Sequence, residues 1–112
     1  MRVYGFTEES AGIMEVENSL RAEQDFVGGH IEVLGIAEGL DIICNDDGKI
    51  NGLPITAAWF DRGELVEIIC GNCFVCRHTA EGEFSSVLDS DIEIIKKILI
   101  PVDSKTGRLR KQ

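Results

Sequence analysis

Three cysteines in one short stretch are the first residues whose type and spacing could support chemistry. Cys70, Cys73 and Cys76 follow one another at intervals of three residues, a spacing at which thiolates in glycine-rich loops bind zinc or iron–sulfur clusters. Their neighbours are of β-strand type, and an interval of three puts successive side chains of a strand on opposite faces. We therefore expect buried core thiols. The alternative is a thiol metal site that Cys44 or His78 would complete.

A polar turn is the second such feature. The run Asn45-Asp46-Asp47-Gly48-Lys49 consists of turn-forming residues, and turn formation alone is sufficient reason for them. It lacks the glycine-rich cradle of a phosphate loop and the acid at the twelfth position of a calcium loop. A small-molecule or nucleotide-binding module is the alternative interpretation. It would use the 45–49 turn for binding, with Lys49 and Arg62 as contacts to an anion.

The sequence offers no convincing catalytic set. Neither His30 nor His78 has a serine or cysteine and an acid at a spacing typical of a catalytic triad. Paired acids such as Glu81 and Glu83 lie in turns, where carboxylates are commonly solvated rather than catalytic. We expect a protein that is not an enzyme and has no cofactor.

Charge restricts the partners. The 112 residues carry a net charge of −9, and residues 1–103 carry seven bases and all twenty acids, a net charge of −13. Such a body repels phosphate backbones, so direct binding to nucleic acid is not expected. An acidic surface could instead occupy a basic groove on another protein, as an inhibitor of a nucleic-acid enzyme would. The simpler interpretation is that the acids keep a small protein soluble.

The chain shows no sign of export or membrane insertion. No apolar run approaches the roughly 18 residues of a membrane span, and residues 1–5 lack the apolar stretch of a signal peptide. Four cysteines without such a signal favour free thiols in a reducing cytoplasm. We expect a cytoplasmic protein with no membrane contact.

The spacing of apolar residues predicts a single α+β domain over 1–103, followed by a basic, disordered tail over 104–112. Alternating patterns predict a mostly antiparallel sheet of five or six strands with both helices packed on one face. The predicted strands are 1–7, 13–17, 30–36, 40–44 and a long run over 64–79. The strands 30–36 and 40–44 are expected to form a hairpin around the three-residue loop 37–39, which contains a glycine. Within that last run, Gly71-Asn72 is either a hairpin turn or a bulge.

Two helices are predicted, over 19–27 and 90–99. Asn18 or Ser19 can cap the first helix, whose apolar stripe begins at Leu20, and Gly28-Gly29 ends it. A capping box over 90–93 begins the second helix, in which Ile92, Ile95, Ile98 and Leu99 form the buried stripe.

Three segments in combination resemble a known family, that of domain of unknown function 3846. They are 26–33 with its Val-Gly-Gly-His-Ile-Glu, 43–49 followed by Leu53-Pro54, and Gly71-Asn72 leading to 81–84. The resemblance spans about residues 13–99. His30 departs from the family's usual aromatic residue, and Ile55-Thr56 replace a common Asn and base.

This resemblance implies a setting rather than a chemistry. Members are small proteins common on bacteriophages and other mobile elements of bacteria, and the family has no established activity. The resemblance implies an accessory protein that acts by binding a host or mobile-element protein in the bacterial cytoplasm. An acidic inhibitor of a host nucleic-acid enzyme is the most specific form of this hypothesis.

Overall fold

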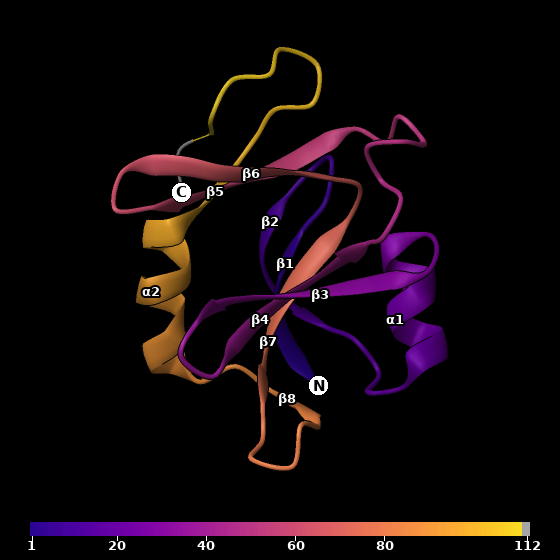
Figure 1. The fold of residues 1–112 in the computed structure, drawn as a ribbon, viewed down its shortest axis with the longest axis vertical. Coiled ribbons are helices and arrows are strands. Elements are labelled where there is room, and N and C mark those ends of the chain that lie inside the picture. The colour runs from indigo at the N-terminus through magenta and orange to yellow at the C-terminus, as the bar shows by residue number, and fades with distance from the viewer. Residues whose placement is uncertain (111–112) are drawn as a thin grey trace.

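The structure, a computed structural model that describes residues 1–110, contains two antiparallel β-sheets and two helices (Figure 1). The larger sheet has six strands in the order β2-β1-β7-β4-β3, with β8 paired to β7. Its strands are β1 (Arg2–Phe6), β2 (Ala11–Glu15), β3 (Ile31–Ala37), β4 (Leu40–Asn45), β7 (Cys73–His78) and β8 (Phe84–Ser85). The predicted α+β class and mostly antiparallel sheet are confirmed.

A second sheet of three strands was not predicted. Its order is β6-β5-β9, and its strands are β5 (Ile55–Asp61), β6 (Glu64–Cys70) and β9 (Leu99–Pro101). β5 and β6 form a hairpin whose two turn residues, Arg62 and Gly63, both have positive φ angles of 52° and 81°. Such angles are typical of the tight turn that matches the twist of a β-hairpin.

Both interpretations of Gly71-Asn72 were wrong. The two residues are neither a hairpin turn nor a bulge, because β6 and β7 belong to different sheets and the link carries the chain from one to the other. Gly71 has a φ of 91°, and a side chain there would collide with Leu53. Glycine therefore allows the chain to change direction where a β-type run predicted continuous pairing.

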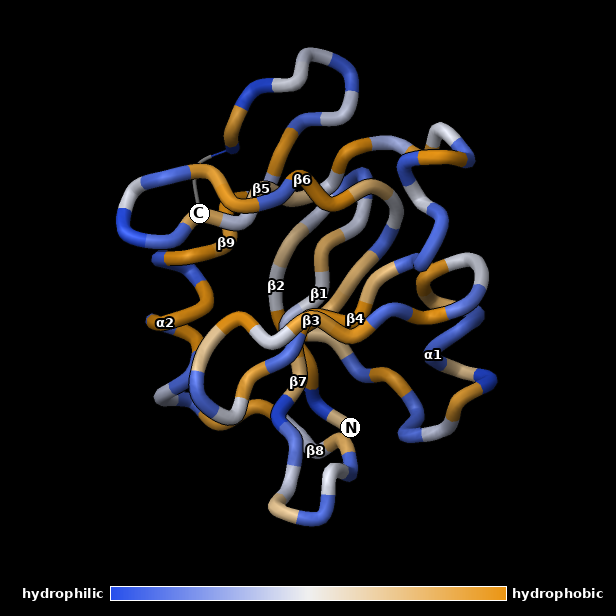
Figure 2. The backbone as a smooth tube through the Cα atoms, viewed as in Figure 1, coloured by the Kyte–Doolittle hydropathy of each residue, from blue (hydrophilic) through white to orange (hydrophobic). Residues whose placement is uncertain are grey.

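The larger sheet is buried on both faces. Along β7, Cys73 and Val75 belong to the core cluster between the two sheets, whereas Phe74 and Cys76 belong to a cluster on the opposite face. Figure 2 shows the apolar residues concentrated along the strands and the polar residues mostly in the connecting loops. The alternation is that of a strand between two apolar layers.

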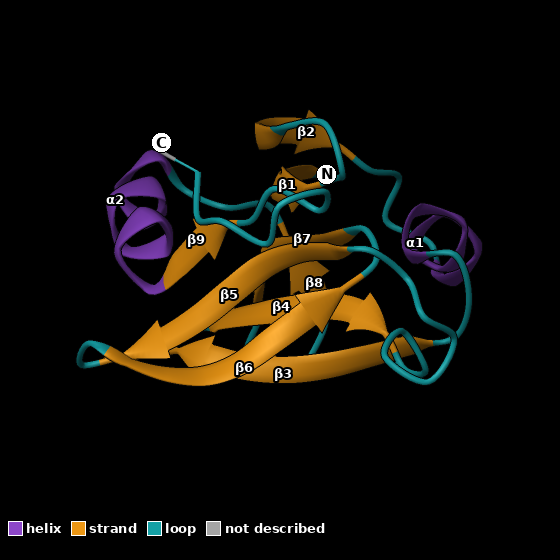
Figure 3. Ribbon diagram, turned by 90° about the horizontal axis from the view of Figure 1, so that it is seen from above, coloured by secondary structure: helices purple, strands orange, loops and turns teal. Residues whose placement is uncertain are grey.

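The prediction that both helices share one face was wrong. Helix α1 (Leu20–Val27) contributes Val27 to the cluster on the outer face of the six-stranded sheet, and helix α2 (Asp89–Ile98) contributes Ile95 to the core between the sheets (Figure 3). Neither helix in the described part of the chain is long and apolar enough to cross a membrane.

Helix α1 begins and ends as predicted. The Ser19 hydroxyl accepts a hydrogen bond from the Ala22 amide at 3.2 Å, and Gly28 ends the helix in the left-handed conformation. Its buried face differs from the prediction, because Leu20 is 57% exposed and Glu23 is buried. Burial raises the pKa of Glu23, whose Oε2 has no hydrogen-bond partner.

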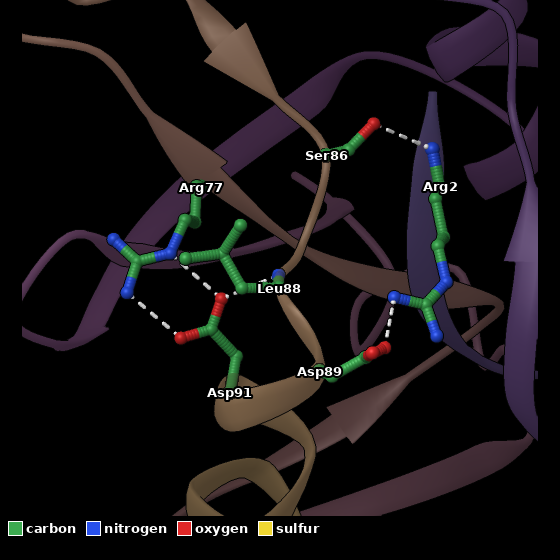
Figure 4. Close-up of polar contacts among 6 residues, drawn as sticks. All are labelled: Arg2, Arg77, Ser86, Leu88, Asp89 and Asp91. Carbon is green, nitrogen blue, oxygen red and sulfur yellow. Dashed lines mark hydrogen bonds and ion pairs between the residues drawn. The ribbon is translucent and has the colours of Figure 1, made fainter.

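The N-cap of helix α2 lies two residues before the predicted cap. The N-cap is Leu88 rather than Ser90, and the Asp91 carboxylate accepts a hydrogen bond from the Leu88 amide at 2.8 Å. The same carboxylate accepts two hydrogen bonds from Arg77 of β7, both of 2.7 Å, and Arg2 of β1 pairs with Asp89 nearby (Figure 4). These ion pairs fix the start of α2 to the larger sheet.

The helix also ends before its predicted limit, and a short strand follows. Leu99 takes an extended conformation and starts β9, so its buried side chain belongs to a strand. Beyond Val102 the chain, predicted to be disordered over 104–112, turns back so that Val102 bridges Leu109. The Asp103 carboxylate accepts hydrogen bonds from the Lys105 and Thr106 amides. Residues 111 and 112 of the predicted tail lie outside the described residues.

Candidate functional site between the two sheets

Asn45 ties the polar turn to the end of helix α1. Its Nδ2 donates to the Val27 carbonyl oxygen at 3.1 Å, and its Oδ1 accepts from the Asp47 amide at 2.8 Å. The side chain is buried, and a Cβ at Gly29 would collide with it. Because both polar atoms of the Asn45 amide group are used within the fold, the role of this residue is to hold the turn in place.

Gly48 brings the turn against strand β6. A Cβ on this glycine would overlap the backbone carbonyl oxygen of Cys70, so only glycine permits this approach. The Gly48 carbonyl oxygen also accepts a hydrogen bond from the Leu53 amide at 2.9 Å. Asn45 and Gly48 therefore fix the position of the turn, whereas the side chains of Asp46 and Asp47 are exposed.

The turn closes one end of a pocket between the two sheets. The pocket has a volume of about 270 Å³. One wall comes from β3 and β4 through Glu32, Leu34 and Cys44, the end comes from residues 45–50, and the other wall comes from residues 67–70 of β6. Among its lining residues are four acids and one base, namely Glu32, Asp46, Asp47, Glu67 and Lys49. The pocket is therefore suited to a cationic group.

Lys49 and Arg62, the two cations expected to contact an anion, do not lie together in the pocket. Lys49 forms an ion pair with Glu67 of β6, which neutralises it within the pocket wall. Arg62 lies in the β5–β6 turn at the other end of β6 and does not line the pocket. A strand of seven residues such as β6 is about 20 Å long. The structure thus brings residues 45–49 together at the pocket and leaves Arg62 outside it.

Sequence reasoning missed the two walls. Glu32 and Cys44 lie directly opposite each other in the β3–β4 hairpin, a register that follows from pairing the predicted strands around a three-residue loop. Glu67 and Cys70 could not be found in this way. They reach the pocket only because β6 belongs to a second sheet that covers the first, and no local pattern indicates that arrangement.

The four cysteines do not converge. Cys73 is buried between the sheets, Cys76 is buried on the opposite face, and Cys44 and Cys70 line the pocket. Over residues 1–110 no group of three or more His, Cys, Asp or Glu side chains is placed to hold a metal ion. The geometry gives no support to the alternative of a metal site at Cys70, Cys73 and Cys76.

The thiols are also poorly ionised. Burial, together with the neighbouring Glu32 carboxylate, raises the pKa of Cys44 to about 12, and burial raises the pKa of Cys76 to about 12 as well. Burial also raises the pKa of Cys70, partly offset by Lys49. Since the thiolate is the reactive and metal-binding form, these thiols act as small apolar groups at neutral pH.

The histidines lie apart from the pocket. His78 Nδ1 lies 2.7 Å from Asp41 Oδ2, and Asp41 stands opposite Cys76 in the β4–β7 register, which places this pair toward the α1 face of the sheet. His30 is exposed, and its carbonyl oxygen accepts a hydrogen bond from the Asp46 amide.

The motif segments that resemble a family contact one another in the fold. Gly29 packs on Asn45, which joins the Val-Gly-Gly segment to the polar turn. The Gly71 amide donates to the Pro54 carbonyl oxygen at 2.7 Å, which joins Leu-Pro to the glycine crossing. These motifs therefore form the contacts that hold neighbouring secondary-structure elements together.

Comparisons with known proteins agree with these motifs. No curated protein and no solved structure matches the chain. Residues 1–100 match the family described as domain of unknown function (DUF3846). The match covers all but the last twelve of the 112 residues, and includes both helices and every strand except the last residue of β9. The chain therefore belongs to the DUF3846 family.

Proposed function

We propose that this chain is a non-enzymatic accessory protein of a phage or mobile element, and that it acts in the bacterial cytoplasm by binding a basic segment of another protein. The observation that carries the proposal is the inter-sheet pocket, where four acids and a single, already paired lysine line the walls. A lysine or arginine side chain of a partner would find the carboxylate of Glu32 on one wall of this pocket and those of Asp46 and Asp47 at its end, while Glu67 on the other wall is paired with Lys49.

The charge of the surrounding elements supports the same partner chemistry. The segment from β3 to β6, residues 31–70, holds eight acids and only two bases. Charge of one sign gathered around a cleft raises the association rate of an oppositely charged partner. A host nucleic-acid enzyme, whose groove carries bases for phosphate contact, is the partner class that fits this charge best.

A small-molecule module is the second candidate, and the pocket itself favours it. Its volume of about 270 Å³ suits a small ligand. The acids around it favour an amine or another cation over a nucleotide, because Lys49 is paired and Arg62 lies elsewhere. A free amine and a lysine side chain share the chemistry that this pocket would recognise.

Affinity capture with charge-matched variants tests the proposal. The tagged protein, the double variant Asp46→Asn/Asp47→Asn and the control Glu81→Gln/Glu83→Gln would each be incubated with host lysate. Both double variants remove two exposed carboxylates, but Glu81 and Glu83 lie in the β7–β8 turn, outside the pocket. We expect the wild type and the control to retain the same basic protein, and the pocket variant to lose most of it. Equal recovery by all three would contradict the proposal.

A further inference from the structure

Strand β6 is the outer strand of the three-stranded sheet. It pairs with β5 on one side only, and within residues 1–110 no strand pairs with its other side. An edge strand presents a row of backbone N–H and C=O groups that are free to pair with another chain. With seven residues, β6 is long enough to take an added strand of ordinary length.

This edge is only partly protected. β6 contains no lysine and no proline, although it carries Glu64 and Glu67, and its register with β5 shifts at Val66. The adjacent β6 residues Leu65 and Val66 are 53% and 48% exposed. Ile50, which lines the pocket beside β6, is 85% exposed. Apolar side chains gathered at an exposed strand edge are typical of an interaction surface.

The two flanks of β6 differ in chemistry. On one flank is the acidic inter-sheet pocket described above. Beside it is a shallow hollow of about 420 Å³, lined by the apolar side chains of Ile55, Leu65, Val66 and Ile68. The two hollows meet along β6, where Lys49, Glu67, Ile68 and Cys70 line both. Successive side chains of an added strand point to opposite faces, so one set would enter the acidic pocket and the other the apolar hollow.

We propose that β6 takes up an extended peptide of alternating basic and apolar residues as a fourth strand of the smaller sheet. The inference rests on the proposed function and names how the basic partner is recognised. A second copy of this chain fits the edge poorly. Antiparallel pairing of two β6 strands would bring Glu64 and Glu67 of each copy together, in a protein of net charge −9.

A designed peptide and two matched variants test this proposal. The probe is a fluorescein-labelled ten-residue peptide of alternating Lys and Val, and the control peptide has five Lys followed by five Val. Val66→Lys places a charge on the β6 edge, whereas Val33→Lys places the same charge on β3, an edge of the other sheet where the valine is 46% exposed. Fluorescence anisotropy measures the affinity.

We expect the alternating peptide to bind the wild type and Val33→Lys alike, and Val66→Lys to weaken it by about fivefold or more, since lysine blocks edge pairing. The block peptide should bind more weakly. Amide hydrogen exchange should slow in β6 and not in β3 when the alternating peptide is bound. The proposal is overturned if both lysine variants weaken binding equally, if both peptides bind equally, or if sedimentation shows a dimer that Val66→Lys dissociates.

The outcome is separable from that of the proposed function. Capture that depends on Asp46 and Asp47 but survives Val66→Lys would overturn strand addition and leave the acidic partner site intact. The opposite result would be loss of peptide binding in Val66→Lys together with capture that does not change in Asp46→Asn/Asp47→Asn. It would support strand addition and overturn the acidic partner site.

Discussion

At the scale of single residues, the polar turn divides into side chains that the fold uses and side chains that it leaves exposed. The side-chain amide of Asn45 is hydrogen-bonded to the backbone of Val27 and Asp47, and only glycine at position 48 allows the turn to contact β6. Asp46 and Asp47 have exposed side chains at the mouth of the pocket. The proposed binding function therefore depends on the two aspartates rather than on the turn as a whole.

Asp91 gives a residue-scale prediction about stability. Its carboxylate is buried, and hydrogen bonds from Arg77 hold the pKa of Asp91 below its usual value. We expect Asp91→Asn to lower the free energy of unfolding by about 1–3 kcal/mol at pH 7, because a buried, charge-assisted pair is broken. Chemical denaturation of the two proteins measures the difference.

The difference in the free energy of unfolding between the wild type and Asp91→Asn should shrink in acid. Because the folded-state pKa of Asp91 is lowered, its contribution is complete above the unfolded pKa near 4 and is lost as the pH falls through the folded value. The gap between wild type and Asp91→Asn should therefore close only in acid below about pH 4. Asp89→Asn is the matched control, since Asp89 is 90% exposed and should matter far less. A gap that stays constant into strong acid would show that Arg77 and Asp91 are not coupled in this way.

At the scale of elements, the contact between the polar turn and β6 positions the pocket. Gly48→Ala would push the turn away from the Cys70 carbonyl group, and we expect a loss of about 1–3 kcal/mol in the free energy of unfolding from overpacking. Gly35→Ala is the control, because a Cβ at Gly35 meets its nearest neighbour, Asp41 Oδ1, at an ordinary 3.8 Å. Thermal unfolding compares the two. Equal stability of both variants would mean that the turn does not rest on β6.

Elements with a local signal could be predicted from the sequence. The cap at Ser19, the glycine end of α1 and the β3–β4 hairpin each depend on a few neighbouring residues, and the structure confirms them. Strand β5 was missed because its buried run of Thr56, Ala57 and Ala58 shows no alternation. The cap of α2 was displaced because Asp91 is held by Arg77, a residue from a distant strand.

Of the candidate site, too, only the part that depends on a local sequence pattern could be predicted. The turn 45–49 is a local pattern, and the structure places it at the pocket. Glu67 and Cys70 were not predictable, since their position depends on the division of one β-type run between two sheets at Gly71. Arg62 was assigned to the site by its charge alone, and the length of β6 separates it from the pocket.

At the scale of the whole molecule, the two sheets leave an acidic pocket and an unpaired edge side by side. The larger sheet is covered on one face by α1 and on the other by the smaller sheet and α2. One open side is where β6 and β3 form the edges of their sheets, and residues 31–70 around it are strongly acidic. Shape and charge thus point to the same surface and to a basic partner.

Zero-length crosslinking measures that claim most directly. A carbodiimide joins a carboxylate to a lysine only where the two are in contact, so crosslinks between the protein and its captured partner locate the interface. We expect the crosslinked acids to be Glu32, Asp46 and Asp47, which line the pocket, each joined to a lysine of the partner, because Glu67 is already paired with Lys49 of the same chain. Crosslinks confined to acids outside the pocket, such as Glu8 and Glu9 or Glu81 and Glu83, would contradict the account.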